Sequence, residues 1–573
     1  MTLDSSNKPR SLAHAEDAIH EKSPISPSSS STSTTTSPSR WHTREFYFYY
    51  VCFTIVVPYM FYVTYNLSKE DNPHYTEYEH LLSEGWIPYR KVDNSDAQYA
   101  TFRDNIPRLF GVVVGYLCLS HLYRIWATPK QLPVKQPHQP LHRIYFFFFA
   151  ALTVITAFHG TSMLKILAII TTSYWIGQSA GGTMWNPIGS WTFNLGILFL
   201  NEWYDGYRFG ALLGPGFVWM DEYKGFQPRW HILFNFVMLR LVSFNMDYYW
   251  QIKKPRDQYE KDDRLGGPIS DKDRITVPCF ASDYNYINFL AYVLYPPLYL
   301  CGPIITFNDF VSQVRYPSHK VTRRFVITYA VRLAVVILVM ELTLHYLYVV
   351  SISKAKAWDG DTPLELSMIG YFNLVIIWMK LLIPWRFFRL WGLADGIFTE
   401  ENMVRCMSNN FSAQRFWKSW HRTFNRWTVR YIFIPLGGSK YMAYNMWVVF
   451  TFVALWHDIE LKLLAWGWLI CLFLMPELIA SRVFSFKKFG SKPYYRFVCG
   501  VGAVANILMM MIANLVGFCV GVDGMVDMLN HIFGTANGLV FLVTVSVCLF
   551  IAVQIMFEIR ETEKRRGDPK WKM

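Results

Sequence analysis

The chain has 573 residues, of which 52% are hydrophobic and only 17% are charged, and its formal net charge is +13. Soluble proteins carry about 25% charged residues, so this composition excludes an ordinary soluble enzyme and indicates a membrane protein. Lys and Arg in loops orient membrane helices and meet anionic lipid headgroups, which accounts for the positive charge. The sequence has no nucleic-acid-binding motif and its nine cysteines form no CxxC pair, so we predict neither a nucleic-acid partner nor a metal site.

The first 40 residues are rich in Ser, Thr and Pro. Such a segment cannot bury enough apolar surface to fold alone, so residues 1–40 are predicted to form a disordered tail. This tail lacks the positive-then-apolar pattern of a cleaved signal peptide. The apolar run 46–65 that follows is therefore predicted to be an uncleaved membrane anchor.

Long apolar runs recur along the rest of the chain. A helix that crosses a bilayer needs about 20 apolar residues, in a range of roughly 17–25. The stretches near 164–175 and 447–456 are shorter and are predicted to be re-entrant or tilted, because irregular backbone in a membrane must be buried in protein. We therefore predict an all-α polytopic protein with roughly 10–13 transmembrane or re-entrant helices. The runs cover residues 46–65, 106–126, 144–158, 184–200, 230–250, 286–305, 325–350, 366–385, 447–456, 461–476, 497–520 and 539–557.

Polar residues in the middle of the chain have mainly structural interpretations. Arg240, Ser243 and Asp247 share one face of an apolar helix and are predicted to form a polar network, because buried charges need partners. Asn235 is predicted to join two helices rather than to bind substrate. Residues 251–283 mix positive and negative side chains and are predicted to be a solvated connector.

A basic and aromatic stretch precedes the last apolar runs. Placed on a helix at about 100° per residue, residues 414–430 collect aromatic rings on one side and arginines on the other, with His421 and Asn425 at the border. Such a helix suits the headgroup interface of a membrane. The aromatic side consists of Trp417, Trp420, Phe424 and Trp427, and the basic side of Arg415, Arg422 and Arg426.

His457 is the strongest candidate for chemistry, because it ends an apolar run and an ionisable side chain there is costly. The unperturbed pKa of histidine suits a general base at neutral pH. Asp458 and Glu460 lie near enough in sequence to select one tautomer of its ring. Trp456 precedes it and would help to exclude water. The alternative is a hydrogen-bonded structural histidine at a helix end.

His421 is interpreted as a second acid–base group, an oxyanion donor or a residue that orients the substrate, with Asn425 one turn further on in the same role. The alternative is an interfacial histidine among aromatic rings. The chain has no Gly-rich phosphate loop, no serine-hydrolase elbow and no HExxH zinc motif. Direct transfer, in which a histidine deprotonates an acceptor hydroxyl, therefore fits these residues best.

The segments around both histidines resemble the membrane-bound O-acyltransferase (MBOAT) family. In that family the second histidine is regarded as catalytic, which implies this role for His457, whereas the earlier position is His, Asn or Asp in different branches. The segments are FWKSWHR at 416–422, NRWTVRYIFIPLGG at 425–438 and WHD at 456–458.

Other segments are similar to the fungal glycerol uptake (Gup) branch of that family, and together they cover nearly all of the chain after the tail. The resemblance implies an MBOAT fold with its helices around a central tunnel. The implied transmembrane domain is 41–560, with a catalytic core at about 286–476 and a basic tail at 561–573. The similar segments are KVDNSD at 91–96, GPIITFNDF at 302–310, IPWR at 383–386 and FEIR at 557–560.

The resemblance also implies an activity. It implies transfer of a long acyl chain from acyl-CoA to the sn-2 hydroxyl of a lyso-GPI lipid, as in GPI-anchor remodelling in the endoplasmic reticulum membrane, with the plasma membrane as a second location. Acyl-CoA is then a substrate, and neither a bound cofactor nor a metal is expected. The implied partners are membrane lipids, a lyso-GPI or lysophosphatidylinositol-type acceptor and other GPI-remodelling proteins. Substrate contacts are expected from Asn425, Trp456, Asp458, Arg422, Arg426 and Arg430, with interface anchoring as the alternative for the arginines.

Glycerol uptake is the alternative function. A glycerol/proton transporter, or a regulator of glycerol uptake, would use His457 and Glu341 as proton-carrying groups. The chain shows no internal repeat of the kind from which many transporters are built, which argues against transport. A catalytically silent scaffold is a third class.

Overall fold

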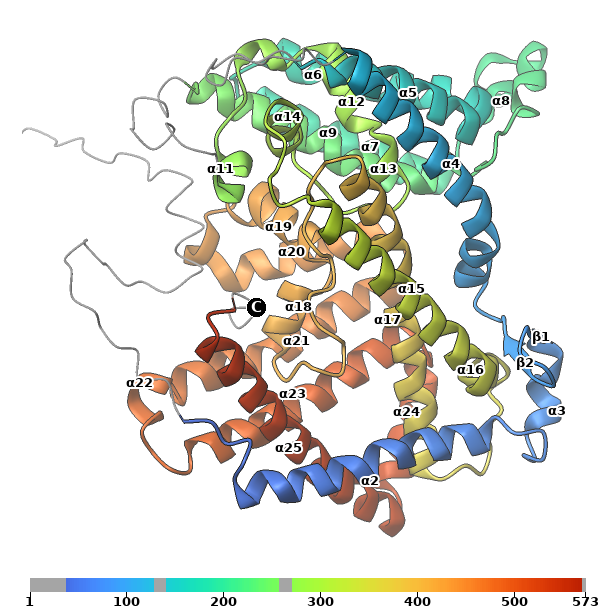
Figure 1. The fold of residues 1–573 in the computed structure, drawn as a ribbon, viewed down its shortest axis with the longest axis vertical. Helices are drawn as coiled ribbons and strands as arrows, with labels where there is room; N and C mark the ends of the chain where they lie inside the picture. The colour runs from blue at the N-terminus through green and yellow to red at the C-terminus, as the bar shows by residue number, and fades with distance from the viewer. Residues whose placement is uncertain (1–37, 128–140, 257–269, 569–573) are drawn as a thin grey trace, which may run out of the picture.

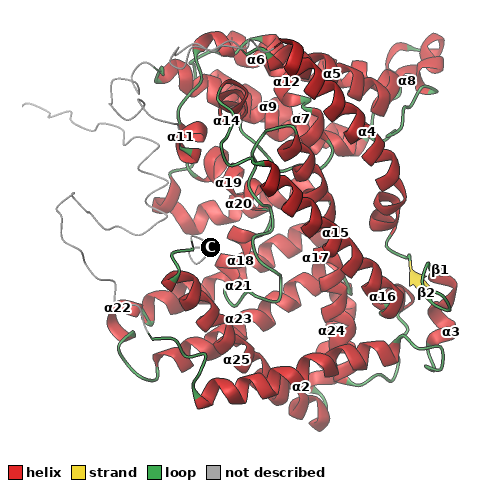
Figure 2. Cartoon of the chain, in the orientation of Figure 1, coloured by secondary structure: helices red, strands yellow, loops and turns green. Residues whose placement is uncertain are grey.

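A computed structural model describes residues 38–127, 141–256 and 270–568 (Figure 1). Across these ranges the chain is mainly helical (Figure 2), and their only sheet is one two-stranded antiparallel hairpin. The predicted all-α polytopic architecture is confirmed. All but the last three residues of the predicted tail 1–40 lie outside the described residues.

Most helices of the first half of the chain gather at the top of Figure 1, but α2 lies at the bottom of the figure, beside α25. Helix α9 is buried over much of its length and forms one large core with its neighbours from α5 to α14. This core is where the candidate site meets the first half of the chain. In order, these elements are α2 (Arg44–Leu67), α3 (Tyr75–Tyr78), η1 (Glu79–Leu81), β1 (Leu82–Glu84), β2 (Lys91–Asp93), α4 (Ala97–Ala127), α5 (Arg143–His159), η2 (Gly160–Ser162), α6 (Met163–Ala180), α7 (Trp185–Trp203), α8 (Phe209–Leu213), η3 (Pro215–Asp221), α9 (Trp230–Lys253), α11 (Asp271–Thr276), η5 (Ala281–Asp283), α12 (Tyr286–Val293), α13 (Pro296–Tyr299) and α14 (Phe307–Arg315).

The second half is organised around the long helix α17, which runs through the middle of the molecule (Figure 1). It forms a second large core with α15, α16 and the start of the chain. The last helices pack at the opposite end from α9. These elements are α15 (Arg323–Tyr346), α16 (Val349–Ala355), α17 (Pro363–Ala394), α18 (Ala413–Ser419), α19 (Arg422–Thr428), η6 (Val429–Phe433), η7 (Gly438–Tyr441), α20 (Met442–His457), α21 (Leu461–Val483), α22 (Phe486–Phe489), α23 (Tyr495–Phe518), α24 (Gly521–Phe533) and α25 (Ala536–Arg565).

Eight stretches of the described chain are long and apolar enough to cross a membrane. The predicted number, roughly 10–13, also counted re-entrant helices. Helix α20 has 16 residues and is too short for an ordinary span, in line with the prediction for 447–456. The eight stretches are Arg44–Leu67, Ala97–Ala127, Arg143–Ala180, Arg323–Tyr346, Pro363–Ala394, Leu461–Phe489, Tyr495–Phe518 and Ala536–Arg565.

The predicted polar network on α9 is present. The Arg240 guanidinium donates to the backbone carbonyl of Val293 at 2.7 Å. The buried Asp247 carboxylate accepts from the guanidinium of Arg430 and the hydroxyl of Tyr431, both at 3.0 Å. These contacts tie α9 to α12 and to the η6 turn, so the charged groups of α9 stabilise helix packing.

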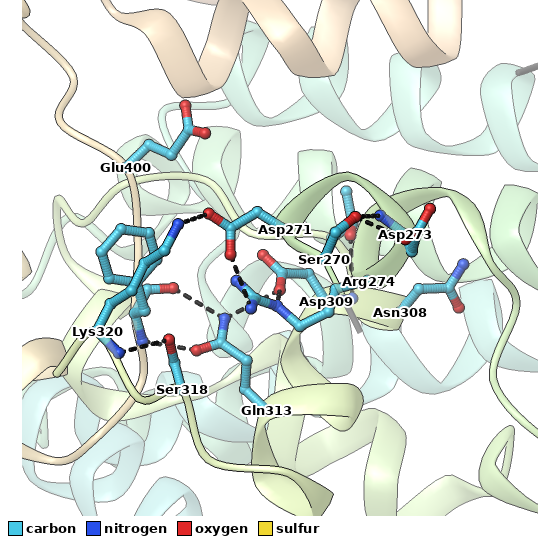
Figure 3. Close-up of polar contacts among 12 residues, drawn as sticks. Ser270, Asp271, Asp273, Arg274, Asn308, Asp309, Gln313, Ser318, Lys320 and Glu400 are labelled. Atoms are coloured by element: carbon cyan, nitrogen blue, oxygen red, sulfur yellow. Dashed lines mark hydrogen bonds and ion pairs between the residues drawn. The ribbon is translucent and has the colours of Figure 1, made fainter. Parts of the chain in front are cut away.

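The connector 251–283 is not solvated at its C-terminal end, so that part of the prediction is wrong. Arg274 on α11 is buried, and its Nε lies 2.9 Å from the carboxylate of Asp309 on α14 (Figure 3). Gln313, also on α14, donates to the carbonyl of Phe398 at 2.8 Å and accepts from its N–H at 2.7 Å. Together these bonds fasten the segment that leaves α17 to the first half of the chain.

A buried carboxylate that sequence analysis did not single out joins three long helices. Asp395 follows the last residue of α17, and its side chain is completely buried. Its oxygens accept from Arg143 at 2.7 Å, Ser120 at 2.6 Å, Tyr116 at 3.2 Å and Tyr295 at 2.5 Å. Arg143 also donates to the Asp395 carbonyl at 2.8 Å, where the negative end of the α17 dipole favours a cation. Asp395 thus links α17 to α4, α5 and the turn before α13.

Helix α25 continues past the predicted start of the basic tail, 561–573. Glu563 forms two hydrogen bonds with the guanidinium of Arg405, at 2.8 and 2.7 Å. Arg560 donates to the carbonyl of Asn409 at 2.6 Å. The last helix therefore holds the loop between α17 and α18, which leads to His421.

Ending the chain after Phe557 is expected to lower the free energy of unfolding by about 3 kcal/mol or more, because the buried Arg405 loses the carboxylate of Glu563. Thermal unfolding of the purified protein in detergent, followed by tryptophan fluorescence, measures the effect. A chain that ends after Asp568 is the control, because it keeps both bonds. Equal unfolding temperatures for the two truncations would contradict the prediction.

Candidate active site

The chain breaks at His421 instead of continuing as one helix. Helix α18 ends at Ser419, α19 begins at Arg422, and His421 has a φ of +45°. The predicted continuous helix over 414–430 is therefore wrong. A left-handed backbone at a residue other than glycine costs roughly 1–2 kcal/mol, so surrounding contacts must hold this turn.

Asn402 supplies those contacts. Its side-chain Oδ1 accepts from the Thr423 N–H at 3.2 Å and from the Thr423 hydroxyl at 2.6 Å. Its backbone carbonyl accepts from the Arg422 N–H at 3.0 Å. Free N–H groups at a helix start are usually capped by the preceding residue. At α19 the cap comes from a distant segment, so tertiary contact imposes the turn at His421.

The His421 ring is buried between two aromatic rings. Trp385 of α17 stacks on one side at 4.3 Å between centroids, and Phe424 on the other at 5.1 Å. Its Nε2 is buried and has no hydrogen-bond partner among the described residues. Burial first, and the nearby His457 second, lower the pKa of His421 well below its ordinary value, so the ring is neutral at pH 7. This burial does not support the alternative interpretation of His421 as an interfacial residue.

His457 is the last residue of α20. Its ring meets the indoles of Trp456 at 5.0 Å and Trp466 at 6.2 Å between centroids. His457 is partly exposed to solvent, but the protein atoms packed around its imidazole desolvate the ring and lower the pKa of His457 to about 4. The expected bond from Asp458 or Glu460 is not formed, and neither ring nitrogen bonds to another described residue. The imidazole is therefore neutral and available to a substrate.

One indole joins the two histidines. The Trp456 ring lies 6.2 Å from the His421 ring and 5.0 Å from the His457 ring, centroid to centroid. Phe424, which stacks on His421, also stacks on Trp456 at 4.4 Å. The structure therefore brings the two predicted histidines, which are 36 positions apart in the sequence, to one aromatic cluster.

The predicted arginines differ in their environments. Arg422 and Arg426 both pair with Glu400, at 2.9 and 2.5 Å, and Arg426 is exposed. Arg430 is buried and its guanidinium pairs with Asp247 at 3.0 Å. This pair holds η6 against α9, so we do not propose a substrate contact for Arg430.

The remaining predicted residues line the same region. The side chain of Asn425 is half-buried one turn after His421 and forms no hydrogen bond with a described residue. Asp458 follows α20 in extended backbone, with φ −173° and ψ 148°. Sequence analysis missed Trp385 as the stacking partner of His421, although the segment 383–386 was one of its matched motifs.

The variant His421→Asn is expected to fold, because asparagine tolerates a left-handed backbone better than other residues. His421→Val should unfold more easily by about 1–2 kcal/mol, because a β-branched side chain is strained at a φ of +45°. Thermal unfolding of both purified variants in one detergent gives the comparison. Equal stability of the two variants would show that the turn is not strained in the folded protein.

Comparison with known proteins agrees with this geometry. Residues 217–522 match the model of the MBOAT, membrane-bound O-acyltransferase family. Membrane-bound O-acyltransferase GUP1 of Saccharomyces cerevisiae is 47% identical over 541 residues, covering 93% of this chain and 94% of that protein. GUP1 of Candida tropicalis is 44% identical over 564 residues, covering 97% and 94%, and gup1 of Schizosaccharomyces pombe is 41% identical over 537 residues, covering 92% and 90%. The chain belongs to the MBOAT family and is a multi-pass membrane acyltransferase, as the motifs predicted.

Metal ligands do not cluster in the part of the chain that the structure describes. No group of three or more His, Cys, Asp or Glu side chains is placed there to hold an ion.

Proposed function

We propose that this protein transfers a long acyl chain from acyl-CoA to the sn-2 hydroxyl of a lyso-GPI lipid, with His457 as the general base. The observation that carries the proposal is the shared contact of His421 and His457 with Trp456. The two neutral imidazoles lie at the aromatic cluster around Trp456, and their ring nitrogens form no hydrogen bond with a described residue. In the proposed complex, the acceptor hydroxyl and the thioester are held together there.

In the proposed reaction an imidazole nitrogen of His457 takes the proton of the acceptor hydroxyl. The hydroxyl oxygen attacks the thioester carbonyl, a C–O bond forms and the C–S bond breaks. The thiolate of CoA then takes the proton from the imidazolium, so that the ester, free CoA and neutral His457 remain. A base that is already neutral suits the first step, because it needs no prior loss of a proton.

His421 is proposed to act on the acyl group or the acceptor instead of as a second base. Its buried Nε2 has no partner, and in the tautomer that carries hydrogen there it would donate to the developing oxyanion. The half-buried Asn425 side chain, one turn on, would support the same oxygen or orient the acceptor. The Trp385 and Phe424 rings restrict the His421 ring, which favours one orientation.

Arg422 and Arg426 are proposed to meet a phosphate of CoA or of the lipid. They share one carboxylate, Glu400, so the cluster keeps an excess of positive charge. Arg426 is exposed and can turn toward a phosphate without leaving a buried charge unpaired. Asp458 and Trp456 are proposed to line the space beside His457.

The acceptor class and the location are proposed from the resemblance of the motifs to the fungal Gup branch. The relatives described above are named membrane-bound O-acyltransferases, and the matched motifs resemble the fungal Gup branch. This supports a lyso-GPI acceptor, action in the endoplasmic reticulum membrane and other GPI-remodelling proteins as partners. The apolar helices that surround the site also suit a lipid acceptor better than a soluble one.

The decisive test incubates the purified protein with long-chain acyl-CoA and either lyso-GPI or lysophosphatidylinositol, and identifies the products by mass. We expect a diacyl product and free CoA in equal amounts. Liposomes that contain only this protein test the rival function by glycerol flux under a proton gradient. Glycerol flux without acylation would replace the proposed function, and acylation of neither lipid would remove the proposed acceptor.

The structure gives the transport alternative little support. Glu341 accepts a hydrogen bond from the Tyr99 hydroxyl at 3.0 Å and lies 3.8 Å from the Arg103 guanidinium. His345, one turn on, is buried and accepts from the Trp86 N–H at 3.2 Å. His345 thus fastens the β1–β2 hairpin to α15, and Glu341 ties α15 to α4.

A further inference from the structure

Helix α9 and helix α20 exchange two hydrogen bonds at Trp456. The side-chain amide of Asn235 donates to the Trp456 carbonyl at 3.0 Å. The indole N–H of Trp456 donates back to the Asn235 carbonyl at 2.8 Å. One residue of α9 is thus bonded to both the backbone and the side chain of the residue that precedes His457.

The first of these bonds acts on a helix end. The last carbonyls of a helix have no partner within it, and the Trp456 carbonyl is one of them, because α20 ends at His457. Asp458 continues in extended backbone. The Asn235 amide therefore caps the final turn of α20 from outside and fixes the backbone from which the His457 side chain projects.

The second bond acts on the indole that the two histidines share. Trp456 is 4% exposed, and its ring is enclosed by Phe236 of α9, centroid to centroid 5.4 Å, and by Phe424 at 4.4 Å. Its N–H bond to Asn235 sets the rotation of the ring in this enclosure. Since both histidine rings lie against this indole, its orientation affects their separation.

His457 has no polar tie of its own. Its ring bonds to no described residue, so its place follows from the α20 backbone and from the flanking rings of Trp456 and Trp466. Asn235 bonds to the first of these flanking residues at both its backbone and its ring. The amide is half-buried on α9 and forms no hydrogen bond with either histidine ring.

We propose that Asn235 is a positioning residue, which holds Trp456 so that His457 and His421 face the same reacting group. This inference rests on the proposed role of His457. A displacement of about 1 Å at a catalytic group can lower a rate about 10²-fold, so the loss of this tie should act on kcat and not on substrate binding.

The test measures kcat and KM for acyl-CoA with the purified full-length protein, with lysophosphatidylinositol as the acceptor probe. Asn235→Ala is expected to lower kcat by about 10- to 100-fold and to leave KM within about twofold. Asn245→Ala is the matched control on the same helix. Its amide bonds instead to the Ser173 carbonyl at 3.0 Å and the Ser190 hydroxyl at 2.9 Å, next to α6 and α7. Its kcat should equal that of the parent.

A double variant separates positioning from general loss of stability. Trp456→Phe removes the indole N–H bond together with part of the ring, keeps the bond from Asn235 to the residue 456 carbonyl, and should lower kcat in the same way. The double variant Asn235→Ala/Trp456→Phe should reduce kcat by less than the product of the two single reductions, because both substitutions disrupt the same Asn235–Trp456 interaction. If Asn235→Ala does not fold, the Trp456→Phe variant alone carries the test, and an unchanged kcat there overturns the proposal.

The inference and the proposed function fail in different ways. If His457→Ala keeps its activity, the base is elsewhere and both fall. The inference alone is overturned if His457→Ala is inactive and the kcat of Asn235→Ala equals that of Asn245→Ala. The same holds if Asn235→Ala changes only the unfolding temperature or only KM.

Discussion

The variant His457→Ala is expected to lose acyl transfer by a factor of about 10² to 10⁴, the usual contribution of a general base. The physical reason is that the only other described imidazole at the same aromatic cluster is that of His421, whose ring is enclosed by Trp385 and Phe424. Mass-detected product from acyl-CoA and lysophosphatidylinositol measures the loss. Size-exclusion chromatography in detergent should show that the variant remains folded.

The control for this variant is His531→Ala. His531 is exposed on α24, and its Nδ1 bonds to the Asp527 carbonyl of its own helix at 2.9 Å, so its removal should not change the rate. A His457→Ala enzyme as active as His531→Ala would remove His457 from the mechanism.

The pH profile gives an independent check on His457. Its surroundings lower the pKa of the imidazole below the ordinary value of 6.5. A lowered pKa keeps the base neutral in more acid solution, so kcat/KM should stay high down through pH 6.5 and fall only below it. An acid limb above pH 6.5 would mean that a different group, or a more solvated His457, is the base.

The variant Asp395→Ala is expected to lower the free energy of unfolding by about 3–5 kcal/mol, because it leaves the guanidinium of Arg143 without its buried carboxylate. Hydroxyls of Tyr116, Ser120 and Tyr295 lose their acceptor as well. A large fall in the unfolding temperature in detergent, or failure to accumulate folded protein, is the result that checks it.

Two comparisons show whether charge burial causes this loss. Asp359→Ala, an exposed aspartate in the turn before α17, should change stability by no more than about 0.5 kcal/mol. Arg143→Met added to Asp395→Ala should recover part of the stability, because the unpaired charge is then gone. An unfolding temperature for Asp395→Ala equal to that of Asp359→Ala would contradict the assigned role.

Features that depend on composition or on local sequence were predictable. Apolar runs of sufficient length predicted the helices that can cross a membrane, and the short run at 447–456 predicted a short helix. The motifs around His421 and His457 predicted the family. The charge pattern on α9 predicted its polar network, because a charge in an apolar helix needs a partner wherever that partner comes from.

Features that depend on contacts with distant segments could not be predicted from the sequence. Periodicity predicted one helix over 414–430, and it failed because Asn402, from another segment, bonds to Arg422 and Thr423 and turns the chain at His421. Arg430 looked like its exposed neighbours, and only its contact with Asp247 shows that it is structural.

The sequence by itself determined that this is a helical membrane acyltransferase with the histidine-containing motifs of the MBOAT family, because hydropathy and short motifs are local properties of the chain. Only the tertiary structure decided how the histidines relate. It placed His421 and His457 against one indole, with no hydrogen bond from their ring nitrogens to a described residue, and it held that indole from α9 through Asn235. The Asn235–Trp456 bonds join residues 221 positions apart, so the packing of whole helices, and no local pattern, sets the geometry of the site.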